Sequence, residues 1–250
     1  MFGKSLFKKS RPQGSRAAAG KKLHPKAITF DCYGTLIDWE TGIKRTLHRI
    51  LWSTNPGGLS AETVFRRWRE VEFELIQKEY KPYREILRES LVATLREFGF
   101  LQLFEDEKEA LGKAMPTWRP FPEVEKTLQK LKARYLIGVV SNVDSDIIER
   151  NLKFVNVQFD VVMTAERAGA YKPSRKIFEL AWRELNGTPS EFLHVGASLH
   201  VDIVPASEFG CSTVWVNRST AQANPTDTEA TFQPDVAVKD LSGLLEVVEL

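Results

Sequence analysis

The chain has 250 residues, 42% of them hydrophobic and 27% charged, an ordinary composition that allows one α/β domain with a sizeable insertion. No stretch approaches the roughly 18 apolar residues that a membrane helix needs, so we expect no membrane partner. No internal repeat of solenoid length is present in the sequence.

The beginning of the chain is basic and differs from the rest. Residues 1–22 hold seven Lys and Arg residues and no acid, and removing these seven charges from the formal +2 leaves −5 for the remainder. A mildly acidic body lacks the footprint of a nucleic-acid-binding protein, so no such partner is expected. We predict that residues 1–24 are a disordered basic tail, with a transit-like segment as the alternative.

Two isolated cysteines, Cys32 and Cys211, form neither a metal-binding spacing nor a disulfide framework. Reduced thiols of this kind indicate a cytoplasmic location. Cys32 stands beside Asp31, and we interpret it as a small apolar filler rather than as a second nucleophile.

The first predicted strand is the apolar run at residues 26–31. It contains the β-branched Ile28 and Thr29, ends at Asp31 and is followed by Gly34, which is typical of a buried strand running into a turn. From residue 41 to 118, charged and apolar residues alternate at helical spacing, and no convincing strand occurs. We expect this region to be a helical insertion.

From residue 121 the pattern becomes an alternation of strands and helices. Strands are predicted at 135–140, 159–163, 192–195 and 212–216, and helices at 124–133, 144–153, 174–185 and 203–209. This alternation implies parallel βαβ units with right-handed crossovers. The predicted fold class is therefore α/β with a Rossmann-like parallel sheet, and its ligands should bind at the carboxyl ends of the strands.

Polar residues gather at those predicted strand ends: Asp31, Ser141, Asn142, Lys172 and Ser198. An Asp held in a glycine turn can attack carbon or phosphorus and form an ester intermediate. A hydroxyl and an amide at a strand end can donate to an anionic substrate. A lysine beside the Asp would keep it ionised and would neutralise charge that develops on the intermediate.

Each of these residues also has a purely structural interpretation. Asp31 could cap its turn, and Lys172 could be a solvated loop residue. Ser141, Asn142 or Asp144 could cap the helix that follows them.

Asp202 enters a predicted helix near the end of another strand. It could orient Lys172 or a hydrolytic water, but an acid at a helix start is also favoured by the helix dipole alone. The order and spacing of all these segments are more specific than any one of them.

Taken together, the segments resemble the haloacid dehalogenase superfamily, and in particular its (S)-2-haloacid dehalogenases. The four motifs of that superfamily resemble Asp31-x-Tyr-Gly-Thr35, Ser141-Asn142, Lys172-Pro173 and Gly196-x-Ser-Leu-x-x-Asp202, and the likeness covers about residues 26–245. The resemblance implies a Rossmann-like core at 25–40 and 119–250 with a helical-bundle cap at 41–118. It also implies that Asp31 is the nucleophile and that Thr35, Lys172 and Asp202 share in catalysis.

Two positions favour a dehalogenase over the phosphatases of the superfamily. Phosphatases carry an Asp where this chain has Tyr33, because an alkoxide leaving group needs a proton whereas a halide needs none. Their fourth motif usually begins Gly-Asp, and Ala197 stands at that place here, so a carboxylate for magnesium is missing. We therefore expect no metal and no cofactor.

In the predicted cap, Trp68-Arg69 resembles the Trp-Arg segment of the dehalogenases, whose arginine lines the halide pocket. The resemblance implies that Arg69 stabilises the departing halide. A solvated basic face formed with Arg66 and Arg67 is the alternative. The residues expected to bind substrate are Tyr33, Arg69, Ser141, Asn142 and Ser198.

Three residues depart from the dehalogenase pattern. The third motif has a Tyr where this chain has Phe178, and the fourth has a Ser and an Asn where it has Ala197 and Leu199. His200 is unusual at its place. It could replace some of the lost hydrogen bonding, or it could point to solvent, and we favour the second.

The sequence thus predicts hydrolytic dehalogenation of small 2-haloacids to 2-hydroxy acids of inverted configuration, through an ester on Asp31. One alternative is a phosphatase for a small phosphorylated metabolite, with magnesium held by Asp31, the Tyr33 carbonyl and Asp202. Another is a non-catalytic anion-binding protein on the same scaffold. The expected partner is a small anionic substrate, and the frequency of symmetric dimers favours a homodimer.

Overall fold

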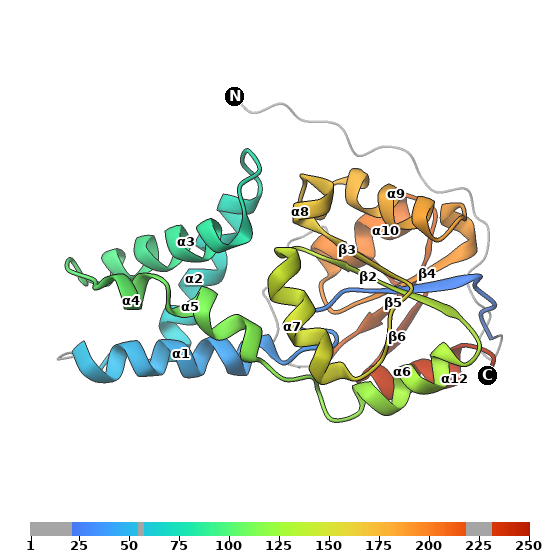
Figure 1. The fold of residues 1–250 in the computed structure, drawn as a ribbon, viewed down its shortest axis with the longest axis horizontal. Helices are drawn as coiled ribbons and strands as arrows, with labels where there is room; N and C mark the ends of the chain where they lie inside the picture. Colours follow the sequence, from blue (N-terminus) through green and yellow to red (C-terminus); the bar gives the residue numbers. More distant parts are fainter. Residues whose placement is uncertain (1–21, 55–57, 219–231) are drawn as a thin grey trace.

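A six-stranded parallel sheet forms the centre of the computed structural model, which describes residues 22–54, 58–218 and 232–250 (Figure 1). The strand order is β3-β2-β1-β4-β5-β6. The predicted α/β class is confirmed. The strands are β1 (Ala27–Phe30), β2 (Leu136–Ser141), β3 (Val161–Thr164), β4 (Phe192–Gly196), β5 (Ser212–Val216) and β6 (Val236–Val238).

Strand β1 lies in the middle of the sheet, and all four of its residues are buried. It pairs in parallel with β2 on one side and with β4 on the other, so that Phe30 stands beside Val139 and Val195. Residues buried on both faces read as a continuous apolar run, which is why the sequence pattern identified this strand. This register brings the residues that follow the three strands to one edge of the sheet.

Helices cover both faces of the sheet (Figure 1). On α9 the buried residues Ile177, Phe178, Ala181 and Trp182 recur at helical spacing, and this apolar stripe packs on β2 and β3. The helices of this part are α6 (Val124–Lys132), α7 (Ser145–Val155), α8 (Ala165–Ala168), α9 (Arg175–Glu184), α10 (Val204–Glu208) and α12 (Leu244–Val247).

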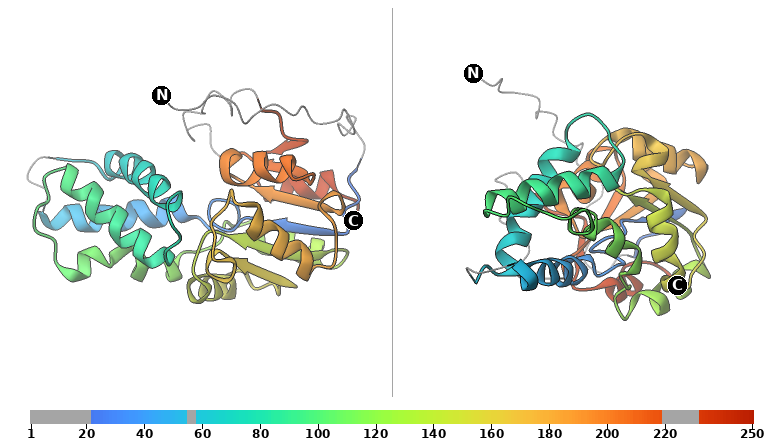
Figure 2. Two further views of the ribbon diagram at one scale, coloured as in Figure 1. Left: turned by 90° about the horizontal axis from the view of Figure 1, so that it is seen from above. Right: turned by 60° about the vertical axis from the view of Figure 1, so that its left-hand side comes forward.

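The predicted helical insertion between β1 and β2 forms a separate body beside the sheet (Figure 2). Its helices are α1 (Trp39–Thr54), α2 (Ala61–Ile76), α3 (Tyr83–Glu97), α4 (Glu105–Lys108), α5 (Ala110–Ala114) and the short η1 (Met115–Thr117). The fully buried Trp68 joins two of them, because its indole nitrogen donates to Ser90 Oγ of α3 at 2.9 Å. We call this body the cap.

Two chain segments that lie side by side connect the cap to the sheet. Ile37 pairs with Pro120 in an antiparallel bridge, and the Asp38 amide donates to the Arg119 carbonyl at 2.9 Å. Asn151 of α7 secures the second segment, since its amide donates to the carbonyls of Met115 and Trp118. These contacts hold the cap next to the turn that follows β1.

Asp144 links the sheet side of the molecule to the cap. Its carboxylate accepts from the amides of Tyr83 at 2.7 Å and Arg84 at 3.0 Å, the first two residues of α3. We considered Asp144 as a cap of the helix that follows it, but its side chain makes no capping bond to α7. A helix leaves its first amides unpaired, and here a residue distant in sequence satisfies them.

Two stretches differ from the sequence-based expectation. Part of the helix expected at 203–209 begins earlier as a π-helix, η3 (Leu199–Ile203), and continues into α10. Strand β6 was not anticipated, because it has three half-exposed or exposed residues and lies at the sheet edge. The short elements η2 (Pro189–Glu191) and η4 (Leu241–Gly243) complete the described part.

Several expectations are not tested by the fold. The predicted tail falls largely on residues 1–21, which lie outside the described residues. The division at residues 41 and 118 into core and cap domains stays a prediction, as do the homodimer and the cytoplasmic location. Cys32 and Cys211 are both buried, and they form no disulfide with each other. Within the described ranges, the helices are too short or too polar to cross a membrane.

The bond between Asp144 and α3 predicts a specific loss of stability. Replacing Asp144 with Ala leaves two helix amides without their acceptor, so the free energy of unfolding should fall by about 1–2 kcal/mol. Urea unfolding measures this. The matched control is Asp146→Ala, which removes an exposed carboxylate that pairs with Arg84. Equal losses in both variants would contradict the proposed link.

Candidate active site

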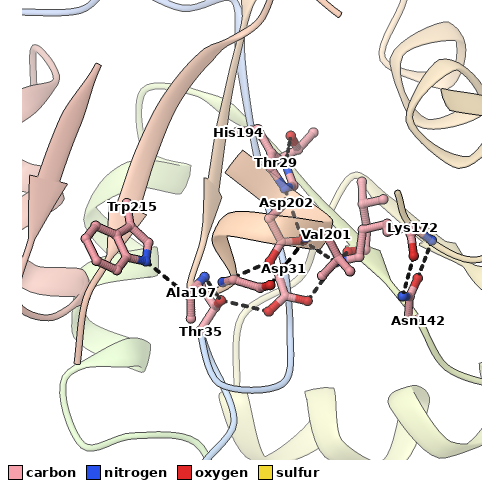
Figure 3. Close-up of polar contacts among 12 residues, drawn as sticks. Thr29, Asp31, Thr35, Asn142, Lys172, His194, Ala197, Val201, Asp202 and Trp215 are labelled. Atoms are coloured by element: carbon pink, nitrogen blue, oxygen red, sulfur yellow. Dashed lines mark hydrogen bonds and ion pairs between the residues drawn. The ribbon is translucent and has the colours of Figure 1, made fainter. Parts of the chain in front are cut away.

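Asp31 leaves the end of β1 with both carboxylate oxygens held. The Thr35 hydroxyl donates to its Oδ2 at 2.8 Å, and the Lys172 ammonium donates to its Oδ1 at 2.8 Å (Figure 3). The turn between Asp31 and Thr35 requires Gly34, whose φ is +96° and whose place leaves only 2.9 Å between an added Cβ and the Trp39 indole. Asp31 is 7% exposed, so the strand and the turn fix the carboxylate in a buried position with a small opening.

Lys172 is buried between two carboxylates. Its ammonium donates to Asp31 at 2.8 Å, to Asp202 at 2.7 Å and to the Val140 carbonyl at 2.8 Å, so all three of its hydrogens are used. Asn142 positions the Lys172 backbone, since its side chain accepts from the Lys172 amide and donates to the Lys172 carbonyl. The predicted structural alternative of a solvated lysine does not hold, because the residue is 1% exposed.

The three charges affect one another's protonation. Burial, and then the charge of Asp202, raises the pKa of Asp31. Burial opposes the charge of Lys172, yet the two carboxylates raise its pKa. Burial likewise opposes the charge of Asp202, but Lys172 and His194 lower its pKa overall. Asp202 and Lys172 therefore form a lasting ion pair, and Asp31 is the carboxylate whose charge is held least strongly.

Gly196 allows Asp202 to reach Lys172. A Cβ at Gly196 would lie 2.6 Å from the Cβ and 2.8 Å from the Oδ2 of Asp202, so only glycine lets this side chain pack against the end of β4. The Ser198 amide donates to Asp202 Oδ2 at 3.3 Å. These contacts explain why β4 ends with a glycine.

The three hydroxyl residues predicted to bind substrate differ in their hydrogen bonds. Ser141 is fully buried, and its hydroxyl has no hydrogen-bond partner among the described residues. Ser198 Oγ accepts from the Val201 amide and so caps η3. The Tyr33 hydroxyl donates to Asn151 at 2.8 Å, and burial above all raises the pKa of Tyr33 well above its usual value. Of these three hydroxyls, Ser141 is thus the one without any hydrogen-bond partner among the described residues.

Arg69 differs from the two arginines that precede it on α2. Arg66 and Arg67 pair with glutamates on the cap surface. Arg69 forms no ion pair with any described residue, and its guanidinium lies 5.8 Å from the centre of the Trp39 ring. Because Trp39 packs on Gly34, this cation lies toward the turn that carries Asp31.

Two neighbours of Arg69 on α2 make contacts of different kinds, Phe73 with the sheet side and Glu72 within the cap. Phe73 contacts the ring of His200 edge-on, with 4.9 Å between the ring centres, although His200 is exposed as we expected. Glu72 accepts from the Tyr83 hydroxyl at 3.1 Å. Burial raises the pKa of Glu72 to about 7, against the effects of Tyr83 and Arg69. The sequence pattern did not single out Glu72, which resembles any other charge on a solvated helix.

Three supporting residues escaped the sequence analysis. The Trp215 indole donates to the Ala197 carbonyl at 2.9 Å, and Arg218 donates to the Thr35 carbonyl at 2.7 Å. His194 lies fully buried in β4 behind Asp202 (Figure 3). A signal for His194 existed, since it is the polar residue in an otherwise apolar strand.

Comparisons with known proteins agree with this geometry. A family model described as haloacid dehalogenase-like hydrolase matches residues 25–210. This chain belongs to that family. Its fold therefore is the Rossmann-like core of these hydrolases with a helical cap, as predicted.

The relatives of the hydrolase include both dehalogenases and phosphatases. The (S)-2-haloacid dehalogenase 4A of Burkholderia cepacia is 28% identical over 215 residues, covering 82% of this chain and 87% of the relative. A glyceraldehyde 3-phosphate phosphatase of Methanothermobacter thermautotrophicus is 32% identical over 240 residues, covering 89% and 99%. The crystal structure of a dehalogenase with an intermediate complex matches with a TM-score of 0.76 at 27% identity, covering 90% of this chain and 97% of that one.

The carboxylates of this site do not fit a magnesium ion well. Magnesium takes oxygen ligands in near-octahedral geometry. In the part of the chain that the structure describes, no three His, Cys, Asp or Glu side chains gather to hold a metal. Asp31 and Asp202 instead each give an oxygen to Lys172. The absence of a cofactor stays a prediction.

Removing the shared cation should destabilise the hydrolase in a pH-dependent way. Lys172→Met leaves Asp31 and Asp202 buried without a counter-charge, so the free energy of unfolding at pH 7 should fall by about 3–5 kcal/mol. Two facing carboxylates raise each other's pKa, and a raised pKa in the folded state means that stability is lost as pH rises. The deficit should therefore shrink from pH 7 toward about pH 5.

Urea unfolding at both pH values measures the deficit. The matched control is Lys176→Met, at an exposed lysine of α9. The electrostatic account would be wrong if both variants lost the same stability, or if the Lys172→Met deficit were constant with pH.

Proposed function

We propose that this hydrolase removes halide from small 2-haloacids and releases 2-hydroxy acids, with Asp31 as the covalent nucleophile. The observation that carries the proposal is the Asp31 carboxylate itself. It is held between Thr35 and Lys172 at the edge of the sheet. A cation of the cap, Arg69, lies against Trp39, which packs on the turn that carries Asp31. The dehalogenases among the relatives support the same chemistry.

In the first step the substrate carboxylate accepts a hydrogen bond from Ser141, whose buried hydroxyl has no other partner among the described residues. An Asp31 oxygen attacks C2 from the side opposite the halogen. A carbon–oxygen bond forms as the carbon–halogen bond breaks, and the halide leaves with the electron pair, so the configuration at C2 inverts. The Arg69 guanidinium stabilises the anion as it departs.

In the second step water attacks the carbonyl carbon of the new ester. Lys172 lies 2.8 Å from an Asp31 oxygen and can stabilise the negative charge that develops there. Asp202 remains ionised beside Lys172, so it can orient the water and accept its proton. The bond between the Asp31 carbonyl carbon and the substrate oxygen breaks, and the product oxygen takes the proton from Asp202. Asp31 releases the second proton of the water to solvent, and the free carboxylate is restored.

A phosphatase is the second candidate, because the archaeal phosphatase is the more identical of the two relatives described above. Attack on phosphorus would require an acid to protonate the leaving alkoxide. Tyr33 stands where the resemblance expects that acid, but its hydroxyl is bound to Asn151 and its pKa is raised well above the usual value. These features favour a leaving group that needs no proton.

The test is a direct comparison of two reactions. The chain is incubated with each enantiomer of 2-chloropropionate and 2-bromopropionate, and, separately with magnesium, with glyceraldehyde 3-phosphate. We expect halide release from one enantiomer, and a loss of at least about 10³-fold in Asp31→Asn, because a nucleophile is removed while the shape is kept.

Two other outcomes would contradict the proposal. Phosphate release that depends on Asp31, without halide release, would assign attack on phosphorus. Binding of 2-chloropropionate with no product from either reaction would favour the non-catalytic anion-binding alternative. An exposed control variant, Asp146→Asn, should leave halide release unchanged, since Asp146 lies on the surface of α7.

A further inference from the structure

A buried histidine lies directly behind the proposed catalytic pair. His194 is 0% exposed in the middle of β4, and its Nδ1 lies 2.9 Å from the Thr29 hydroxyl of β1 (Figure 3). Its Nε2 lies 3.7 Å from Asp202 Oδ1, the same oxygen that accepts from Lys172. No described residue forms a hydrogen bond with Nε2.

The contacts of the ring favour one of its two nitrogens as the carrier of the proton. The Thr29 hydroxyl has two possible acceptors, the Leu193 carbonyl at 3.5 Å and His194 Nδ1 at 2.9 Å, and the shorter contact is the better hydrogen bond. When Thr29 donates to Nδ1, the proton of the neutral imidazole is on Nε2. The N–H group then points toward a carboxylate oxygen, whereas the other tautomer would present a lone pair to it.

The surroundings leave His194 as the polar group on this side of Asp202. The Phe178 ring packs edge-on against the imidazole, with 5.1 Å between the ring centres, and offers no hydrogen bond. Phe178 stands where the dehalogenase pattern has a tyrosine hydroxyl. The charged groups that face this corner are Asp202 and, beyond it, Lys172 and Asp31.

We propose that His194 is a positioning residue, which steadies the Asp202 carboxylate against Lys172 by directing its Nε2–H group at Asp202 Oδ1, with its tautomer fixed by Thr29. This inference rests on the proposed function, in which Asp202 orients the water that hydrolyses the ester. His194 touches neither substrate nor the reacting atoms. Its effect therefore falls on ester hydrolysis and leaves ester formation nearly unchanged.

The first test needs no substrate. Long-range ¹H–¹⁵N correlation spectra of protein labelled in its histidines distinguish the two neutral tautomers. We expect the signals absent from His194→Phe to belong to an Nε2–H tautomer, and Thr29→Val to disturb it. The control is His24→Phe, at an exposed histidine that pairs with Glu249, and it identifies the effect of removing any histidine. An Nδ1–H tautomer at His194 would overturn the proposal.

The second test is kinetic and compares variants of His194 whose side chains differ in length. The amide nitrogen of Gln can take the place of Nε2, while that of Asn cannot reach it. We expect His194→Phe and His194→Asn to lower kcat by about tenfold with kcat/KM within about twofold, because only the second step slows. Ester-modified protein should then accumulate and appear by mass spectrometry, and His194→Gln should recover most of kcat.

The outcomes separate this inference from the proposed function. Equal losses in kcat and kcat/KM without accumulated ester, or no difference between Gln and Asn, would show that His194 only fills space. If wild-type protein releases no halide, the proposed function fails. The spectra then still decide the contact, since the tautomer of His194 does not depend on a substrate.

Discussion

Three charges are buried together where β1, β2 and β4 end, and most of the site depends on their arrangement. One lysine ammonium serves two carboxylates, and each of its hydrogens meets an oxygen within 2.8 Å. Buried charges are costly unless they are paired and hydrogen-bonded. The neighbouring residues meet this demand: Asn142 fixes the backbone of Lys172, Gly196 makes room for Asp202, and Thr35 takes the second oxygen of Asp31.

This arrangement divides the work between two carboxylates of the same chemical type. Asp202 has no exposed surface and is surrounded by donors, so its pKa is lowered and it stays charged. Asp31 has a small opening and a raised pKa, and its charge disappears when an ester forms. In the proposed reaction, formation of the ester therefore relieves the repulsion between the two acids, and hydrolysis by water restores it.

The cap adds to the sheet edge a cation without an ion-pair partner among the described residues, Arg69. Its two connecting segments pair beside the turn of Asp31, and Asp144 holds the start of α3. Within the cap, Arg69 of α2 lies against Trp39, which packs on Gly34 of that turn. In the proposed reaction this cation meets the departing anion, because Lys172, in the loop between α8 and α9, already has three partners.

The sequence revealed the residues whose type and order are constrained by chemistry. Asp31, Thr35, Lys172 and Asp202 were found because each follows a strand that an apolar run predicts, and the structure brings these four side chains together. Their catalytic roles stay proposals. The supporting residues depend on contacts between distant segments, which spacing cannot show. Asp144 was considered as a side-chain cap of α7, but its carboxylate bonds to α3. In the sequence alone, His194, Trp215 and Arg218 resemble ordinary strand or loop residues.

The central claim, that Asp31 forms an ester with carbon and is freed by attack on its own carbonyl, can be tested with labelled water. A single turnover of 2-chloropropionate with excess hydrolase in H₂¹⁸O should place ¹⁸O in the Asp31 carboxylate, measured by mass spectrometry of its peptide. The 2-hydroxy acid formed should then contain oxygen from the protein. A first-turnover product that carries ¹⁸O, with Asp31 unlabelled, would contradict the account and would mean that water attacks the substrate directly.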